Sequence, residues 1–265
     1  MKKFDGILLA TDLDGTLLRN DKSVSEENKK AIEYFKSEGG RFTFITGRTP
    51  IAVASLCELL HPNAPIGCMN GAGIYDYGKN ELLWHINIPD SVLEIVEAIE
   101  KEFPNTGIEV VTERKIIFCK KNYFTDKHAK DEALPIFDGN YHDVNEGMIK
   151  ILFADSPEVL DSLSKAVLAH PRAREFAPIR SDSIYYELLP LGISKATVIK
   201  KIPELLGGAI TKTIAVGDND NDAEMLKAAD IGFAVSNASA AAKQCADFIT
   251  VSNEEHAIAK IIYEL

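Results

Sequence analysis

The hydrophobic pattern of the first 70 residues alternates between short apolar runs and amphipathic segments. Residues 7–11 (ILLAT), 41–46 (RFTFIT) and 66–69 (IGCM) form apolar runs that are typical of buried strands. Between them, Ser25 predicts the start of one helix, and Thr49-Pro50 predicts the start of another that ends at Leu60. This strand and helix order predicts a parallel sheet with helices on both faces.

The pattern changes near Trp84, where the spacing of apolar residues no longer follows one strand and one helix in turn. We expect helices over residues 91–103 and 157–169, and strands over 108–111, 115–119, 148–154 and 183–189. The first two strands are close enough in sequence to pair as a hairpin. Tyr185 and Tyr186 alternate along one strand, so one of them should point inward. This stretch is therefore expected to form an α+β insert with a mostly antiparallel sheet.

The alternating pattern resumes at Ile193. It predicts helices over residues 195–206, 222–229, 238–245 and 254–263, and strands over 213–216, 232–235 and 248–251. One α/β domain is therefore split by another. We expect residues 1–83 and 188–265 to form a Rossmann-like core with a parallel sheet, and residues 84–187 to form the inserted α+β domain.

Composition and charge restrict the partners of this chain. The 265 residues are 46% hydrophobic and 26% charged, which is ordinary for a soluble globular protein. The net charge of −11 argues against a nucleic-acid partner, which usually requires a clustered basic surface. No apolar run approaches the ~20 residues that span a membrane, so no membrane association is expected. No feature of the sequence indicates an obligate protein partner.

The cysteines and the N-terminus indicate a cytoplasmic protein. Cys57, Cys68, Cys119 and Cys245 are scattered through apolar surroundings and form no metal-binding or disulfide pattern. We expect buried free thiols, which persist in a reducing compartment. Two lysines precede the apolar run at residues 7–10, but that run is too short for a secretory signal.

Polar residues follow several of the predicted strands of the core domain. Asp12 and Asp14 come after the first strand, Thr46-Gly47-Arg48 after the second, and GDNDND (residues 217–222) after the strand at 213–216. Lys195 opens the helix that follows the insert. Ligands bind at the carboxyl edge of parallel α/β sheets, so we expect these stretches to converge there.

The residue types at this edge suit phosphoryl transfer around a magnesium ion. Asp12, Asp14, Asp218 and Asp222 provide the hard oxygen ligands that Mg²⁺ prefers. A cation offsets the repulsion between neighbouring carboxylates, which leaves one free to form an aspartyl-phosphate and another to act as general acid and base. The hydroxyl of Thr46 and the positive charge of Lys195 would bind the phosphoryl oxygens.

Four motifs in order resemble the haloacid dehalogenase superfamily of phosphohydrolases: DLDGTL (12–17), TGR (46–48), SK (194–195) and GDNDND (217–222). The insert after NGA (70–72) is similar to the α/β cap, type C2B, of the Cof-type subfamily. The resemblance covers essentially the whole chain. It implies a magnesium-dependent phosphatase, a phosphoric monoester hydrolase, that acts on small phosphorylated metabolites, in particular sugar phosphates, through an aspartyl-phosphate.

The resemblance also implies roles for individual residues. Asp12 would be the nucleophile and a metal ligand, and Asp14 the general acid and base, with its backbone carbonyl on the metal. Asp218 would be a metal ligand, and Asp222 would support the metal or contact Lys195. Phosphate binding would involve Leu13, Thr46, Gly47, Lys195 and Asn221. Arg48 and Asn70 would lie at the mouth of the site, within reach of substrate. Ala196 and His256 stand where related sequences carry glycine, and we expect His256 on the surface of the last helix.

Several alternatives remain open from the sequence. A phosphomutase would pass the phosphoryl group back to a sugar, and product analysis separates it from a phosphatase. A phospho-acceptor signalling domain would accumulate a long-lived phosphoprotein, and a metabolite-binding regulator would bind without turnover. A Ca²⁺ loop at residues 218–229 lacks the glycine and glutamate that such loops require. In the insert, we expect the basic residues Arg114, Lys115, Lys120, Lys121 and His128 to be solvent-exposed.

Overall fold

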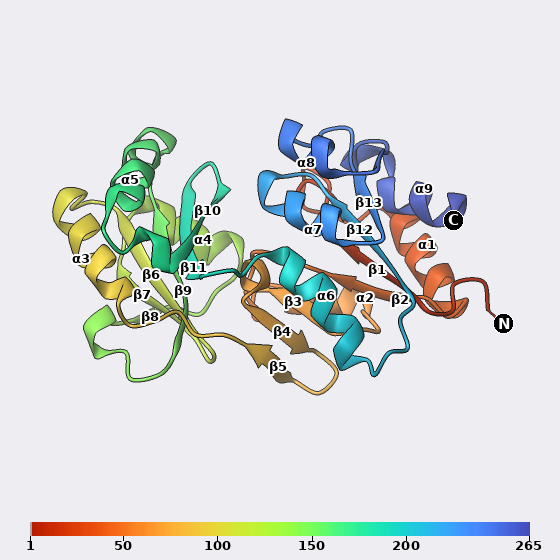
Figure 1. The fold of residues 1–265 in the computed structure, drawn as a ribbon, viewed down its shortest axis with the longest axis horizontal. Coiled ribbons are helices and arrows are strands. Elements are labelled where there is room, and N and C mark those ends of the chain that lie inside the picture. Colours follow the sequence, from red (N-terminus) through yellow and green to blue (C-terminus); the bar gives the residue numbers. More distant parts are fainter. Residues whose placement is uncertain (1) are drawn as a thin grey trace. The chain divides into compact units, whose positions relative to one another are not determined.

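The computed structural model describes residues 2–265 as two compact units (Figure 1). The core unit contains residues 2–84 and 194–265, and the inserted unit is His85–Ile193. The second boundary lies beyond residue 187 because the last strand of the inserted unit continues to Pro190. Within residues 2–265, none of the helices is both long enough and apolar enough to cross a membrane.

A five-stranded sheet forms the centre of the core unit. In spatial order its strands are β14 (Phe248–Ile249), β13 (Ile231–Ala234), β12 (Lys212–Gly217), β1 (Ile7–Thr11) and β2 (Arg41–Phe44). All neighbours pair in parallel. β1 lies between two strands, and Leu8, Leu9 and Ala10 are fully buried, which explains why its sequence is a continuous apolar run. The expected parallel α/β core is confirmed.

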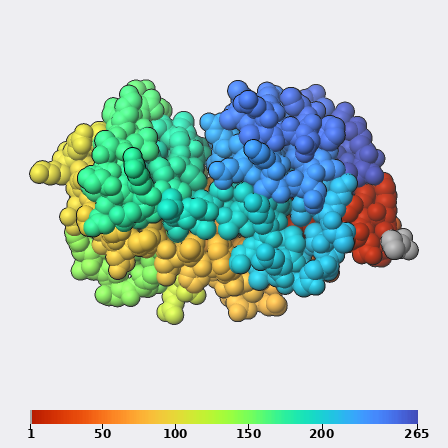
Figure 2. Space-filling view, in the orientation of Figure 1, coloured from red at the N-terminus to blue at the C-terminus, as the bar shows by residue number. Residues whose placement is uncertain are grey.

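Helices cover this sheet. They are α1 (Glu26–Ser37), α2 (Ala54–Leu60), α6 (Lys195–Leu205), α7 (Ala223–Ala228), α8 (Ala240–Cys245) and α9 (Ala257–Glu264). The Ser25 hydroxyl accepts a hydrogen bond from the Asn28 N–H and caps α1, as expected. α1 packs beside α9, and α6, α7 and α8 form a second row. On the face shown in Figure 2, the cyan to blue residues after Ser194 cover much of this unit, and red N-terminal residues reach the surface at its right edge.

Three predictions for the core unit are wrong in detail. β3 (Ile66–Cys68) does not extend the parallel sheet beyond one parallel bridge at Ile45; it pairs antiparallel with β4 (Gly73–Asp76), which is followed by β5 (Glu81–His85). The helix expected at Thr49 begins at Ala54, because Pro50 opens a separate turn. The last helix begins at Ala257, because His256 has a left-handed backbone (φ 61°) and ends the preceding 3₁₀ turn at Asn253–Glu255.

Other expected boundaries in the core unit shift by a few residues. α7 and α8 begin one and two residues later than predicted, and β14 ends at Ile249. His256 is half-buried rather than a surface residue of a helix, with 35% of its side chain exposed. Its left-handed conformation explains the preference for glycine at this position. Cys57 and Cys68 are buried as expected, whereas Cys119 and Cys245 are only partly buried; all four are free thiols.

The inserted unit contains a six-stranded sheet with helices. In spatial order the strands are β10 (Phe176–Asp182), β11 (Tyr185–Pro190), β9 (Met148–Ala154), β6 (Gly107–Thr112), β7 (Ile116–Lys120) and β8 (Phe137–Asp138). All pairs are antiparallel except β7 with β8, so the mostly antiparallel sheet is confirmed. The helices are α3 (Val92–Glu102), α4 (Tyr123–Asp131) and α5 (Pro157–Ala169).

The inserted unit has its own hydrophobic core. α3 and α5 lie side by side against the sheet, and Ile95, Val96, Leu160 and Leu163 are buried beneath them. Tyr186 belongs to this core while Tyr185 is half-exposed, which confirms the expected alternation. The prediction that His128 is exposed is wrong, because α4 packs against β6 and buries His128.

Candidate active site

The carboxyl ends of β1 and β12 bring two of the expected aspartates together. Asp12 directly follows β1, and Asp218 directly follows β12. The Asp12 N–H donates a hydrogen bond of 2.8 Å to the Val216 carbonyl, which continues the parallel register past the end of β1. Residues that are about 200 positions apart in sequence therefore lie at one edge of the sheet.

Lys195 connects this edge to the helix after the inserted unit. Its ammonium donates hydrogen bonds of 2.7 Å to both Asp12 Oδ1 and Asp222 Oδ1. All three side chains are buried, with 2% of Lys195, 8% of Asp12 and none of Asp222 exposed. Lys195 is the first residue of α6, after Ser194, whose N–H donates to the Thr197 hydroxyl at 3.3 Å and whose carbonyl accepts from the Thr197 N–H at 2.9 Å. The helix start therefore fixes where the ammonium lies.

Asp222 stabilises the loop that carries Asp218. Its Oδ2 accepts hydrogen bonds of 3.0 Å from the N–H groups of Asp218 and Asn219. A side chain on Gly217 would come within 2.6 Å of Asp222 Cβ, so this close loop requires glycine. Of the two roles expected for Asp222, the contact with Lys195 is present in the structure.

The loop after β1 encloses Asp218 from the other side. The Thr16 hydroxyl donates a 2.8 Å hydrogen bond to Asp218 Oδ1. Gly15 has φ +79°, and a Cβ at that position would collide with the Asp218 carboxylate. The glycine of DLDGTL is therefore required both by its backbone conformation and by the close approach of Asp218.

Three carboxylates at this edge exceed the positive charge that Lys195 supplies. Burial raises the pKa of Asp12 well above its ordinary value, and the negative charge of Asp222 raises it further, although Lys195 opposes both effects. Burial and Asp222 also raise the pKa of Asp218 to about 6. Burial lowers the pKa of Lys195, but Asp12 and Asp222 outweigh burial, so this pKa is raised overall. The cluster retains an excess of negative charge.

The geometry of this cluster suits a divalent cation. Asp12, Asp218 and Asp222 each offer one oxygen, and these oxygens lie within 4.8 Å of one another. Carboxylate oxygens are the ligands that Mg²⁺ prefers, and the cradle formed by Gly15 keeps the Asp218 carboxylate close. The residues present therefore fit the expected ion. The Asp14 side chain does not belong to this group.

The Asp14 carboxylate is instead paired with two cations. Arg48 binds it through two hydrogen bonds, from Nε at 2.8 Å and from Nη2 at 2.7 Å, and Lys22 adds a third at 2.8 Å. Burial raises the pKa of Asp14, but the hydrogen bonds and charge of Arg48, followed by those of Lys22, lower it below its ordinary value overall. Arg48, expected at the mouth of the site, is largely covered, with 16% of its side chain exposed.

A second group of expected residues is held together at the ends of β2 and β3. Thr46 is 1% exposed, and its Oγ1 accepts a 3.2 Å hydrogen bond from the Arg48 N–H. Asn70 is fully buried, and its N–H donates to the Thr46 carbonyl at 3.0 Å. Asn221 donates from Nδ2 to Asn70 Oδ1 at 3.1 Å, and its own Oδ1 is buried without a hydrogen-bond partner. Asn70 therefore links the Thr46 loop to the Asp218 loop.

Asn70 and Gly47 fit closely at this point. Asn70 has φ 53°, an uncommon conformation for a residue other than glycine. A Cβ on Gly47 would lie 3.0 Å from the Asn70 amide, which is a tight contact that the amide would have to move to relieve. Leu13, expected to contribute its backbone N–H, has a fully buried side chain and accepts hydrogen bonds at its carbonyl from Thr16 and Leu18.

The sequence did not single out three residues that support this edge. Thr16 holds Asp218, Lys22 pairs with Asp14, and Asn237 donates from Nδ2 to the Gly15 carbonyl at 2.8 Å. Thr16 lies within the DLDGTL motif, so its position was a signal that could have been used. Lys22 and Asn237 lie outside every motif, and only the folded chain brings them to the site.

Comparison with known proteins identifies a hydrolase family and relatives that are named phosphatases. The model of the haloacid dehalogenase-like hydrolase family matches residues 9–262. A 5-amino-6-(5-phospho-D-ribitylamino)uracil phosphatase of Bacillus subtilis, YcsE, is 30% identical over 256 residues, which cover 96% of this chain and 94% of that protein. The phosphatase YwpJ of the same organism is 28% identical, with 97% and 99% covered.

A solved structure has the same fold. The crystal structure of a haloacid dehalogenase-like hydrolase from Bacteroides thetaiotaomicron superimposes with a TM-score of 0.85 and 25% identity, and the match covers 99% of each chain. The two-unit architecture of this chain is therefore similar to that of a known hydrolase over its full length.

Proposed function

We propose that this chain, which belongs to the haloacid dehalogenase-like hydrolase family by the match over residues 9–262, is a magnesium-dependent phosphatase that uses Asp12 as its nucleophile. The observation that carries the proposal is the position of Asp12. Its carboxylate is buried beside Lys195 and within reach of Asp218 and Asp222 at the carboxyl edge of a parallel sheet. Family membership and the phosphatase names of the relatives support the same reaction class.

Asp12, Asp218 and Asp222 would hold the magnesium ion. When bound, the ion would neutralise the excess negative charge of the cluster and draw phosphoryl oxygens toward Asp12. Lys195 holds Asp12 Oδ1 through a 2.7 Å hydrogen bond, so the other oxygen, Oδ2, remains available for attack. In the proposed first step Oδ2 forms a bond to phosphorus while the bond from phosphorus to the leaving oxygen breaks, which yields an aspartyl-phosphate.

Thr46, Asn221 and Lys195 would orient the phosphoryl group. The Thr46 hydroxyl oxygen already accepts from Arg48 N–H, so its own hydrogen is free to donate to a phosphoryl oxygen. The Nδ2 of Asn221 is directed by Asn70, which fixes the amide orientation. Positioning and charge stabilisation of this kind are the main contributions of a protein to phosphoryl transfer.

Asp14 would transfer protons in both steps. It would give a proton to the leaving oxygen in the first step, and it would take one from the water that hydrolyses the aspartyl-phosphate in the second. Arg48 and Lys22 lower the pKa of Asp14, which favours the base form. The acid role therefore requires that the Arg48 pair open before the first step, which would also make Arg48 available to the substrate together with Asn70.

We propose small phosphorylated metabolites, in particular sugar phosphates, as the substrates. The relative YcsE is named for a substrate that carries a phosphorylated ribityl chain, which is a phosphorylated polyol. The four free cysteines support a cytoplasmic location, since free thiols persist in a reducing compartment.

Phosphate release from a panel of phosphorylated sugars and sugar alcohols, with and without Mg²⁺, tests the proposal. We expect multiple turnovers that require Mg²⁺, and a loss of about 10⁴-fold or more in the Asp12→Asn variant, because an amide is a poor nucleophile. Asp220→Asn is the matched control, since Asp220 lies in the same loop but is exposed and bonded to Ser239. Full activity of Asp12→Asn would overturn the assignment of the nucleophile.

A further inference from the structure

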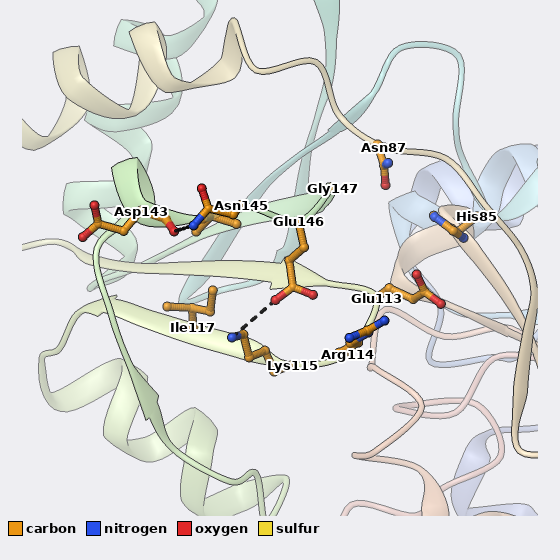
Figure 3. A pocket seen from close by; sticks show the side chains of 11 residues that line it. His85, Asn87, Glu113, Arg114, Lys115, Ile117, Asp143, Asn145, Glu146 and Gly147 are labelled. Atoms are coloured by element: carbon orange, nitrogen blue, oxygen red, sulfur yellow. Dashed lines mark hydrogen bonds and ion pairs between the residues drawn. The ribbon is translucent and has the colours of Figure 1, made fainter.

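The inserted unit contains a cavity of about 490 Å³ whose lining residues all belong to His85–Ile193 (Figure 3). Three segments form its walls. They are the chain around His85 and Asn87, the turn between β6 and β7 at residues 113–115, and the loop at residues 143–147 before β9. Its volume is in the range of small-molecule sites, which is about 300–1,000 Å³.

The backbone of each wall is fixed. Thr112 is 3% exposed, and its hydroxyl accepts hydrogen bonds from the Arg114 and Lys115 N–H groups, which shapes the turn. The Ile88 N–H donates to the Met148 carbonyl at 2.7 Å, which joins the first wall to β9. A Cβ on Gly147 would collide with the amide of Asn87, so glycine lets these two walls meet. The cavity is therefore built by the fold and not by loose side chains.

Two side-chain contacts join pairs of residues that line the cavity, one between the turn and the loop and one within the loop. Lys115 Nζ lies 3.3 Å from Glu146 Oε1, so the turn and the loop are joined by an ion pair. Asn145 donates from Nδ2 to the Asp143 carbonyl at 3.1 Å, which leaves the oxygen of its amide available. Arg114, Glu113 and His85 lie together on the opposite side in Figure 3.

Most polar side chains that line this cavity are exposed to solvent and have no partner in the part of the chain that the structure describes. Within residues 2–265, no hydrogen bond or ion pair is made by the side chains of His85, Asn87, Glu113, Arg114 and Asp143. They offer both kinds of partner, because the guanidinium and the amide nitrogen donate while the carboxylates accept. Ile117 and Val144 add a small apolar surface.

The charge of the lining restricts the ligand. Two cationic and three anionic side chains give a formal charge of −1 with His85 neutral, and one of each sign is already paired between Lys115 and Glu146. A phosphorylated compound would meet two unpaired carboxylates, those of Glu113 and Asp143. A simple cation would leave Arg114 and the amides without acceptors. Hydroxyl groups both donate and accept, and a carbon chain or ring suits the apolar patch.

We propose that this cavity binds a small neutral polyhydroxylated molecule, a free sugar or a sugar alcohol. None of the residues that line the cavity belongs to the core unit, so binding here can be tested separately from the proposed catalytic chemistry. Such a molecule could come from solution or could be the product of sugar phosphate hydrolysis. A catalytically inactive variant releases no product, so any binding to it comes from polyol in solution.

Titration of the 265-residue chain with D-ribitol and with D-glucose, followed by protein NMR at the His85, Asn87 and Asn145 resonances, tests the site. We expect saturable shifts for at least one probe at concentrations up to ~10 mM. Arg114→Ala combined with Asn145→Ala should weaken binding at least tenfold. Arg174→Ala is the matched control, since Arg174 is exposed in the same unit but does not line the cavity, and it should change affinity less than twofold.

The Asp12→Asn variant distinguishes failure of this site from failure of the proposed function. This variant should bind the polyol as the wild type does, because the polyol is added directly to the protein and no turnover is needed to produce it. No saturable shift with either probe would overturn the proposal. Shifts with inorganic phosphate or putrescine alone, or equal binding by the double variant, would overturn it as well.

Discussion

The two units each contain a cluster of buried charges, and the clusters differ in how completely they are compensated. In the core unit, Asp12, Asp218 and Asp222 face one ammonium, that of Lys195. In the inserted unit, His128 lies between Glu109 and Glu132, with Nδ1 at 2.8 Å and Nε2 at 3.3 Å from their carboxylates. Lys150 pairs with Glu187 at 3.0 Å, and Ser181 donates to the same Glu187 oxygen.

This difference distinguishes a candidate ligand-binding cluster in the core unit from a structural charge cluster in the inserted unit. In the inserted unit the buried carboxylate of Glu109 has its own cationic partner, and the pKa of His128, which burial lowers, is raised by Glu109 and then Glu132 to about 10. In the core unit the pKa values of Asp12 and Asp218 are raised, because burial and neighbouring carboxylates exceed the charge of Lys195. A buried excess of one sign is relieved either by taking up protons or by binding a ligand of the other sign.

Of the changes that test this comparison of the two clusters, removal of Lys195 should have the largest effect on stability and activity. Lys195→Met leaves Asp12 and Asp222 buried without their partner, so we expect a loss of about 3–5 kcal/mol in the free energy of unfolding. Activity should fall by about 10³-fold, because the charge beside the nucleophile is lost. Urea unfolding and phosphate release measure the two effects. Lys200→Met, at an exposed position of α6, should change neither, and similar values for both variants would contradict the role of Lys195.

Removing the charge of His128 tests the support in the inserted unit. His128→Gln keeps a hydrogen-bonding side chain but leaves the fully buried Glu109 without a cation, so unfolding should become easier by about 2–4 kcal/mol. Magnesium affinity should not change, because the metal cluster is in the core unit. Lys127→Gln removes an exposed ion pair with Asp131 on the same helix and should leave unfolding unaltered. A change in magnesium affinity in His128→Gln would contradict the separation.

The pH dependence of stability provides a finer test of the same histidine. The folded pKa of about 10 lies above the ordinary value of 6.5, so the stabilisation by the imidazolium is complete below pH 6.5 and is lost as the pH rises toward 10. The wild type should therefore lose more unfolding free energy across this window than His128→Gln does. Urea unfolding of both proteins at several pH values compares the slopes, and equal slopes would show that His128 is not the titrating group.

The smallest predicted effect concerns a backbone position and not a charge. His256 has φ 61° at the start of α9, a conformation that glycine adopts without strain. We expect His256→Gly to stabilise the protein by about 0.5–1 kcal/mol, since the relief of strain exceeds the added entropy of the unfolded chain. Thermal unfolding should show a higher midpoint with unchanged activity. Destabilisation would mean that the contact of His256 with Glu27 matters more than the backbone.

The features that depend on local sequence were predictable. α5 begins and ends at the predicted residues because Ser156 caps it and Pro157 suits its first turn. β1 was recognised from its apolar run, and the family resemblance and the expected hydrolase class are confirmed by the family match. The resemblance to known motifs named the residues of the cluster at the ends of β1 and β12, and their catalytic roles stay proposals.

The features that depend on tertiary contacts were not predictable. Thr49-Pro50 is an ordinary helix-start signal, yet the chain there forms a turn, and the helix begins only at Ala54. His128 is a polar residue on a helix, and only the distant Glu109 explains its burial. The pairing of Asp14 with Arg48 and Lys22 likewise arises from loops that the sequence does not relate to one another.

The most direct test of the central claim is a calorimetric titration of the protein with Mg²⁺ in the absence of substrate. An uncompensated cluster predicts one ion per chain for the wild type, affinity reduced at least about tenfold in Asp218→Asn, and affinity unchanged in Asp220→Asn. Equal magnesium affinity in wild type and Asp218→Asn, or no magnesium binding to the wild type, would contradict it.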